Sequence, residues 1–103
     1  MMSDFVAIAA DDELKPAQMK RVVVDGKRLL LCNSNGTHYV VDEMCSHEDY
    51  SLYLGCIKDG RIKCSLHGSY FDLATGRPTC EPADEPIRTY EVKVADGQVW
   101  VRV

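Results

Sequence analysis

The stretch CSHEDYSLYLGCIKDGRIKCSLH, from Cys45 to His67, holds three of the five cysteines and two of the three histidines of this 103-residue chain. Its potential metal ligands form two pairs, Cys45-x-His47 and Cys64-x2-His67, separated by sixteen residues. An Asp-Gly dipeptide at 59–60 predicts a hairpin between the pairs. A hairpin brings its two flanking loops together, so one Cys and one His from each loop can converge on one metal centre.

Two kinds of metal centre fit this set of ligand types. Two thiolates and two imidazoles satisfy tetrahedral zinc, which would make the chain a structural module. Common zinc fingers, however, pair Cys with Cys and His with His across a helix, and no helix is predicted here. In a 2Fe–2S cluster with mixed ligands, two cysteines hold one iron and two histidines hold the other. One Cys and one His in each loop therefore favour the cluster, with zinc as the alternative.

The turn residues predict an all-β fold. Dipeptides that tolerate positive φ stand at 25–26, 35–36, 59–60 and 96–97, each between β-type runs. The predicted strands cover 5–9, 19–24, 28–33, 37–41, 56–58, 61–63, 69–71, 87–94 and 98–103. Many short strands at short spacing indicate an antiparallel β-sandwich or partly open barrel. In the strand at 87–94, the alternating set Arg88, Tyr90, Val92 and Val94 is expected to face the core.

The bulk composition restricts the classes of partner and compartment. With 46% apolar and 27% charged residues, the chain is expected to form one domain over 1–103. A net charge of −4 argues against nucleic acid and anionic membranes. No signal peptide or apolar run of about eighteen residues is present, so we expect a cytoplasmic protein. Thiols stay reduced there, and an odd number of cysteines favours metal binding over a disulfide framework.

The paired motif C-x-H-x16-C-x2-H resembles the Rieske signature, and CSLHGSYFDLATG at 64–76 is similar to the second cluster-binding loop of small Rieske-type ferredoxins. The similarity includes the hairpin between the loops, the F-D-x-x-T-G turn, a proline-bearing third loop and a closing hairpin. It therefore spans essentially the whole chain. The resemblance implies a Rieske-like fold in which a small cluster-binding subdomain of two loops and a hairpin, at about 43–72, is inserted in a β base domain.

The resemblance also implies the roles of the four ligands. Cys45 and Cys64 would bind the inner iron of one 2Fe–2S cluster as thiolates. His47 and His67 would bind the outer iron through Nδ1, with their Nε2 edges toward solvent. Neutral imidazoles in place of thiolates make the cluster less negative, which raises its reduction potential above that of all-cysteine ferredoxins.

By the same resemblance, the chain is expected to be a monomeric one-electron carrier and not an enzyme. It would take electrons from an NAD(P)H-dependent flavoprotein ferredoxin reductase and pass them to the terminal oxygenase of an aromatic ring-hydroxylating dioxygenase system. The alternative is a small Rieske subunit of an oxygenase or of a nitrite-reductase-like complex. A terminal oxygenase also needs a mononuclear iron site, usually two histidines and a carboxylate. Only His38 remains for such a site, so this chain alone cannot build one.

Departures from the respiratory members of the family indicate a lower potential. Those proteins carry an extra, disulfide-bonded cysteine in each cluster loop, whereas this chain has Ser65-Leu66 in the second loop and places Cys56 too far along the first. Ser69 matches a serine that donates to the cluster, but Phe71 stands where a tyrosine hydroxyl is expected. Because donors stabilise the reduced cluster, we predict a potential in the lower half of the range of roughly −150 to +300 mV.

The remaining candidate residues have mainly structural interpretations. Cys32 in the run RLLLC is expected to be a small buried hydrophobe. Cys56 is expected to pack in its strand, with a displaced ligand as the alternative. Cys80 is expected to pack over the cluster, with a redox role as the alternative. His38 is expected at the surface or hydrogen-bonded. The acidic pair at 48–49 is either part of a docking surface or a solvated loop.

Overall fold

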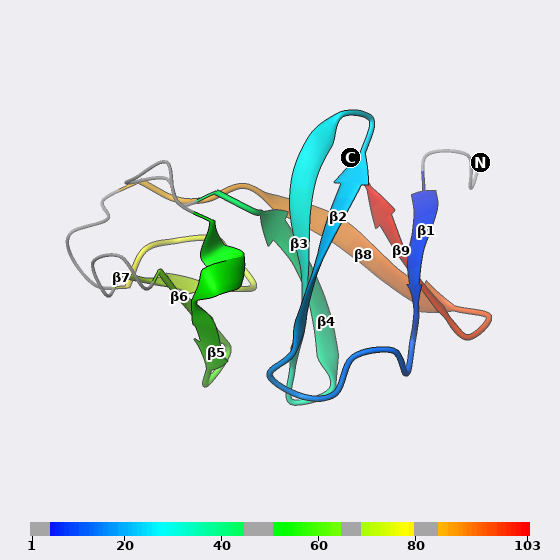
Figure 1. Ribbon diagram of the computed structural model, residues 1–103, viewed down its shortest axis with the longest axis horizontal. Coiled ribbons are helices and arrows are strands. Elements are labelled where there is room, and N and C mark those ends of the chain that lie inside the picture. The colour runs from blue at the N-terminus through cyan, green and yellow to red at the C-terminus, as the bar shows by residue number, and fades with distance from the viewer. Residues whose placement is uncertain (1–4, 45–50, 65–68, 80–84) are drawn as a thin grey trace.

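The computed structural model describes residues 5–44, 51–64, 69–79 and 85–103, and within them the chain forms two antiparallel sheets (Figure 1). The six-stranded sheet has the order β1 (Phe5–Ala10), β9 (Gln98–Arg102), β8 (Thr89–Ala95), β4 (Thr37–Asp42), β3 (Lys27–Ser34) and β2 (Met19–Val24). The three-stranded sheet has the order β5 (Cys56–Lys58), β6 (Arg61–Cys64) and β7 (Ser69–Asp72). A short 3-10 helix, η2 (Leu52–Leu54), precedes β5. The all-β prediction is confirmed.

The large sheet curls toward a barrel. Its two edge strands approach each other. Lys20 Nζ on β2 donates to the Ile8 carbonyl on β1 at 3.1 Å. Three of its neighbouring strand pairs, β2–β3, β3–β4 and β8–β9, are joined by the tight turns that the dipeptides predict. At Asp25 and Gly26, for example, φ is 52° and 76°, the positive pair that a type I′ turn requires. The partly open barrel therefore combines local hairpins with two long-range antiparallel pairings, β1 with β9 and β4 with β8.

Strand β3 has apolar side chains on both faces and separates two cores. Leu29 and Leu31 point into the barrel core, which we define by Val24, Leu29, Leu31, Val40, Val99 and Val101. Leu30 and Cys32 point into the inter-sheet core, which we define by Leu30, Cys32, Val41, Leu52, Ile57, Ile62, Cys64, Phe71, Leu73 and Ile87. The side chains from Leu29 to Cys32 are 0% exposed. The inter-sheet core therefore joins the small sheet to the large one.

The end of β8 differs from the alternation expected for it. Tyr90 and Val92 pack against the barrel core as predicted. Val94, however, is 51% exposed, and Arg88 lies before the strand and is exposed. Val94 pairs with Val99 one position from the last pair before the β8–β9 turn, and Val99 is buried in the barrel core, so only the β9 side of this pair is covered. The expectation was wrong for these two residues.

Candidate metal centre

The small sheet positions the one predicted ligand that lies within the described residues. Cys64 is the last residue of β6, is 1% exposed and belongs to the inter-sheet core. The register pairs it with Ser69, the first residue of β7, so the second ligand loop is the connection between two paired strands. The other predicted ligands, Cys45, His47 and His67, lie outside the described residues. The described residues alone contain no group of three or more His, Cys, Asp or Glu side chains that could hold a metal ion.

The two ends of the first ligand loop are joined by a buried carboxylate. Met44 and Ser51 form an isolated antiparallel bridge, and the Leu52 N–H donates to the Glu43 carbonyl at 2.7 Å. Ser51 Oγ also donates to Glu43 Oε2 at 2.6 Å, although Glu43 is only 7% exposed. Arg28 Nε lies 4.0 Å from Glu43 Oε1 and partly compensates its charge. The residues before and after the segment that contains Cys45 and His47 are therefore bonded to each other.

Helix η2 is held against β6 by a close backbone approach. Ser51 Oγ accepts from the Tyr53 N–H at 3.2 Å, and the Gly55 N–H donates to the Leu52 carbonyl at 3.0 Å. A Cβ atom at Gly55 would lie 1.7 Å from the Lys63 carbonyl oxygen. Only glycine fits there, because any side chain would push η2 away from the residue before Cys64. Close approach to the neighbouring strand is thus sufficient to explain this glycine.

The chain that follows β7 is fixed by a second turn. Asp72 Oδ1 accepts from the Ala74 N–H at 2.8 Å, and the Gly76 N–H donates to the Asp72 carbonyl at 2.7 Å. Gly76 has a φ of +78°, and its carbonyl accepts from the Ile87 N–H at 2.8 Å. The segment after the second ligand loop is therefore connected directly to the chain that leads into β8.

These features fit a cluster with thiolate and imidazole ligands. Cys64 is buried in the inter-sheet core, which also contains Leu52, Ile62 and Phe71, so this ligand is shielded from water. The ends of both ligand loops are fixed by backbone hydrogen bonds rather than by long flexible side chains. A rigid, partly dry setting of this kind preserves ligand geometry and tunes the metal group.

Three other predictions can be compared with the described residues. Cys32 is buried, which raises the pKa of its thiol to about 12, so its role as a small hydrophobe is confirmed. Cys56 is exposed, so the expectation that it packs in its strand is wrong. It opens the edge strand β5, where the next residue, Ile57, takes the inward position. His38 has a buried Nε2 without a hydrogen-bond partner in the described structure, contrary to expectation.

Besides the ligand roles of Cys45, His47 and His67, two more predictions stay untested because their residues lie outside the described part of the chain. These are the packing role of Cys80 and the docking role of the acidic pair at 48–49. Sequence reasoning also missed Glu43 and Ser51. Their only signal was a carboxylate two residues before the first ligand and a helix-capping residue after the loop.

Comparison with known proteins decides the family. The sequence matches the Rieske [2Fe-2S] domain over residues 4–91. The chain belongs to this family. The cofactor of a Rieske protein is a 2Fe–2S cluster, so the prediction of the cluster is confirmed and the zinc interpretation is not supported. In the described residues, no helix is long and apolar enough to cross a membrane.

Relatives of this Rieske protein match it over nearly its whole length. It is 30% identical over 102 residues to an anthranilate 1,2-dioxygenase ferredoxin subunit of Burkholderia cepacia, covering 99% of this chain and 94% of that one. It is 33% identical over 94 residues to the biphenyl 2,3-dioxygenase ferredoxin component of Rhodococcus jostii (strain RHA1), covering 91% and 88%. Among solved structures, it is similar to a chain in a complex of reduced oxygenase and oxidized ferredoxin in carbazole 1,9a-dioxygenase. That match has a TM-score of 0.91 at 28% identity and covers 96% of this chain and 93% of the other.

Proposed function

We propose that this Rieske protein is the one-electron carrier of an aromatic ring-hydroxylating dioxygenase system. The observation that carries the proposal is the nearly end-to-end match to ferredoxin components of such systems. The carrier takes electrons from an NAD(P)H-dependent flavoprotein reductase and delivers them to the terminal oxygenase. It contributes to hydroxylation without catalysing it, and it works as a monomer in the cytoplasm.

Cys45, His47, Cys64 and His67 are the proposed ligands, within a cluster-binding subdomain at about 43–72. When bound, the 2Fe–2S cluster accepts one electron and gives it up again. The chain supports this chemistry by holding the ligand loops at fixed ends, through Ser51 on one side and the β6–β7 pairing on the other. Fixed loop ends would limit the rearrangement of the ligand loops when the charge of the bound group changes.

The first test is spectroscopic and kinetic. The purified protein should be red-brown, and its dithionite-reduced form should give the EPR signal of a histidine-ligated 2Fe–2S cluster. NADH with a flavoprotein reductase of a dioxygenase system should reduce the cluster, and the matching terminal oxygenase should reoxidise it. A colourless protein with stoichiometric zinc would refute the cofactor. A coloured protein that exchanges no electrons with either partner would refute the carrier role. A midpoint potential above about +100 mV would contradict the predicted lower half of the Rieske range.

The ligand assignment needs a separate test. Cys64→Ser should abolish the visible spectrum and the EPR signal, because a serine hydroxyl is a poor substitute for a thiolate on iron. The matched control is Cys80→Ser, which should leave both spectra intact. Equal loss of the cluster in the two variants would show that the assignment is wrong.

A further inference from the structure

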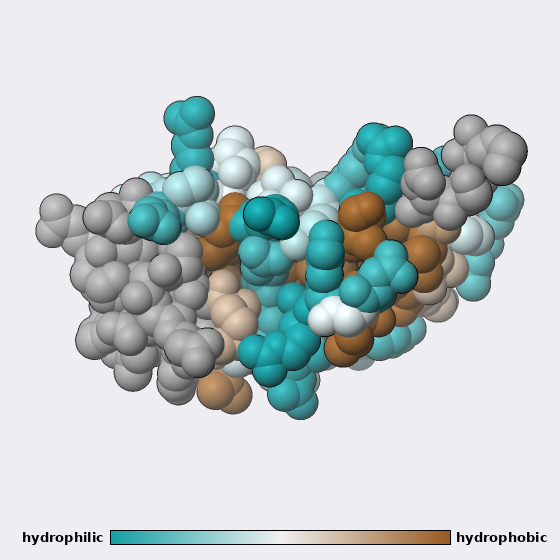
Figure 2. Space-filling view, turned by 90° about the horizontal axis from the view of Figure 1, so that it is seen from above, coloured by the Kyte–Doolittle hydropathy of each residue, from teal (hydrophilic) through white to brown (hydrophobic). Residues whose placement is uncertain are grey.

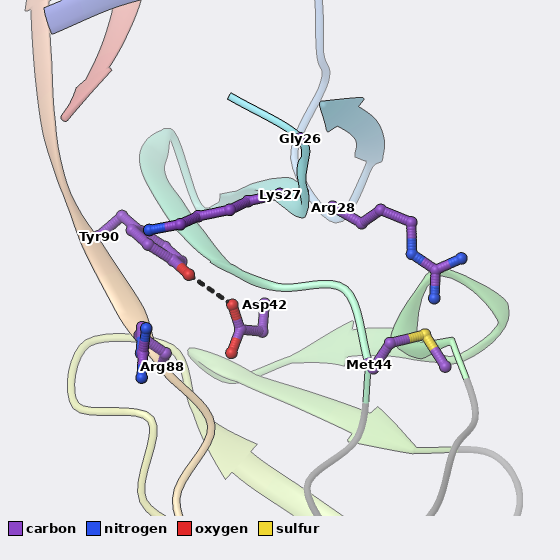
Figure 3. Close-up of a pocket in the computed structure, with 7 residues that line it drawn as sticks. All are labelled: Gly26, Lys27, Arg28, Asp42, Met44, Arg88 and Tyr90. Carbon is purple, nitrogen blue, oxygen red and sulfur yellow. Dashed lines mark hydrogen bonds between the residues drawn. The ribbon is translucent and has the colours of Figure 1, made fainter. Parts of the chain in front are cut away.

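A hollow of about 440 Å³ lies at one end of the large sheet, where the chain leaves β4 and where it later enters β8. It is lined by the β2–β3 turn with the start of β3, by the last residue of β4 and Met44 two residues later, and by Arg88, just before β8, and Tyr90 near its start. Its lining residues are Gly26, Lys27, Arg28, Asp42, Met44, Arg88 and Tyr90. Figure 3 shows Lys27 extending over Tyr90, Arg88 beside Asp42, and Arg28 on the side of Met44. We call this feature the basic hollow.

The charge of the basic hollow is opposite to that of the chain. Three cations and one carboxylate line it, whereas the whole chain has a net charge of −4. The carboxylate, Asp42, accepts a hydrogen bond from the Tyr90 hydroxyl at 2.6 Å. Partial burial and this bond raise the pKa of Tyr90 to about 12 against the opposite effect of Arg88, so the hydroxyl remains a donor to Asp42.

Much of the positive charge is available to a partner. Lys27 forms no ion pair with any residue that the structure describes, and it is exposed. Arg28 has a side chain that is 58% exposed, and its contact with Glu43 is at the 4.0 Å limit for an ion pair. In Figure 1 the β2–β3 turn lies at the top of the molecule, so it projects toward the viewer in Figure 2, where hydrophilic side chains cover much of the middle of the face.

The basic hollow is next to the proposed metal centre along the chain. Met44, which lines it, directly precedes Cys45. Arg28, on the same rim, contacts the Glu43 carboxylate that holds Ser51 at the other end of the first ligand loop. A molecule seated in the hollow would therefore touch Met44, which directly precedes the first proposed ligand.

We propose that the basic hollow is a docking site for an acidic segment of a redox partner protein, with Lys27 and Arg28 binding its carboxylates. The inference rests on the proposed carrier function. A polypeptide is favoured over a free anion because exposed ion pairs are individually weak, and a segment with several linked carboxylates can engage several cations at once. The hollow adds charge recognition at Met44, the residue before the first proposed ligand, on a chain whose net negative charge would otherwise repel such a partner.

The test uses the full chain with its cluster, and hexaglutamate labelled with a far-red dye as the probe. Fluorescence anisotropy at low ionic strength measures binding, because salt screens exposed pairs. Lys27→Glu with Arg28→Glu should weaken binding about tenfold or more, since it replaces two attractions by two repulsions. The matched control, Lys15→Glu with Lys58→Glu, changes the net charge equally at exposed positions away from the hollow and should change affinity less than about twofold.

Lys27→Glu alone leaves the contact between Arg28 and Glu43 in place and should weaken binding about threefold. If the double variant loses its visible spectrum, the single variant Lys27→Glu is used to test whether the hollow binds the peptide. No binding by the wild type, or equal weakening in the hollow and control variants, would overturn the proposal. So would displacement of the peptide by inorganic phosphate at matched concentration, which would indicate a site for a small anion. Any of these results with intact spectra and intact electron transfer would refute docking while leaving the carrier function in place.

Discussion

The two sheets differ in where their stability comes from. The large sheet closes around its own barrel core, with side chains from β2, β3, β4 and β9. The small sheet has three short strands, and its buried side chains, such as Ile62 and Phe71, are in the same core as Leu30 and Cys32 of the large sheet. Three strands this short need another surface to pack against. The metal centre therefore depends on the large sheet, whereas the large sheet has a core that does not need the metal centre.

The largest expected effect on stability comes from substituting two neighbouring leucines of β3. Leu30→Ala and Leu31→Ala remove the same side chain from the inter-sheet core and the barrel core, respectively. Each should lower the free energy of unfolding by about 2–5 kcal/mol, because both sites are fully buried. Only Leu30→Ala should also accelerate loss of the cluster, since it loosens the packing under Cys64.

Denaturant unfolding followed by circular dichroism measures the first effect, and decay of visible absorbance in the presence of a chelator measures the second. The two leucines serve as controls for each other. If Leu31→Ala releases the cluster as fast as Leu30→Ala, the two cores are not separate in the way described, and the molecule responds as one unit.

A smaller effect is expected where η2 meets β6. Gly55→Ala places a Cβ atom on the Lys63 carbonyl and should destabilise the protein by about 3 kcal/mol, the upper end of the overpacking range. The control is Gly60→Ala, at a φ of +75° with no atom within 4 Å of the added Cβ. It should cost about 1 kcal/mol through backbone strain alone. Cluster retention should fall only in Gly55→Ala. Equal loss in both would mean that the approach of η2 to β6 does not position Cys64.

The bond between Ser51 and Glu43 should contribute less. Ser51→Ala removes a donor from a buried carboxylate and should destabilise the protein by about 1.5 kcal/mol, near the lower end for a bond to a charged group, because Arg28 can move closer. The cluster should then dissociate faster, as the first ligand loop loses one of its closing contacts. Ser51→Thr, which keeps the hydroxyl, should restore both values. No recovery by threonine would assign the effect to packing instead of the hydrogen bond.

The smallest effect leaves the fold unchanged and concerns thiol reactivity. Cys56 is exposed on the small sheet, while burial raises the pKa of Cys32 to about 12. Because the thiolate is the reactive form and Cys32 is both buried and hard to ionise, Cys56 should be alkylated much faster than Cys32. Mass spectrometry after brief alkylation of cluster-loaded Cys80→Ser protein measures the ratio. Comparable labelling of Cys32 would indicate that β3 opens readily on its inter-sheet face.

Much of the fold could be predicted from the sequence because its turns are local. An Asp-Gly or Asn-Gly dipeptide prefers positive φ at both residues, so it marks a hairpin independently of the rest of the chain. The strand positions followed from these turns and agree closely with the structure. The cluster could be predicted because the spacing of its ligands is specific, and the family match agrees with it.

The errors concern properties that depend on distant parts of the chain. Cys56 and Val94 are in strands as expected, but their exposure depends on where each sheet ends, which no local pattern records. The run RLLLC does not by itself distinguish a strand buried on both faces from other apolar segments. Glu43 and Gly55 take their roles from Ser51 and Lys63, partners that only the folded chain brings into contact.

The hydrogen bond from the Asp42 N–H to the Arg88 carbonyl, at 2.9 Å, joins the point where the chain leaves the large sheet to the point where it returns. The chain between these residues is thus an insertion, or excursion, between β4 and β8, and its two ends are hydrogen-bonded neighbours. Lengthening such a loop costs little additional entropy, because its ends are brought together once and the cost grows only slowly with length. The large sheet can therefore accept excursions of different length, and a redox centre could be exchanged as a unit if the new segment still covers Leu30, Cys32 and Val41.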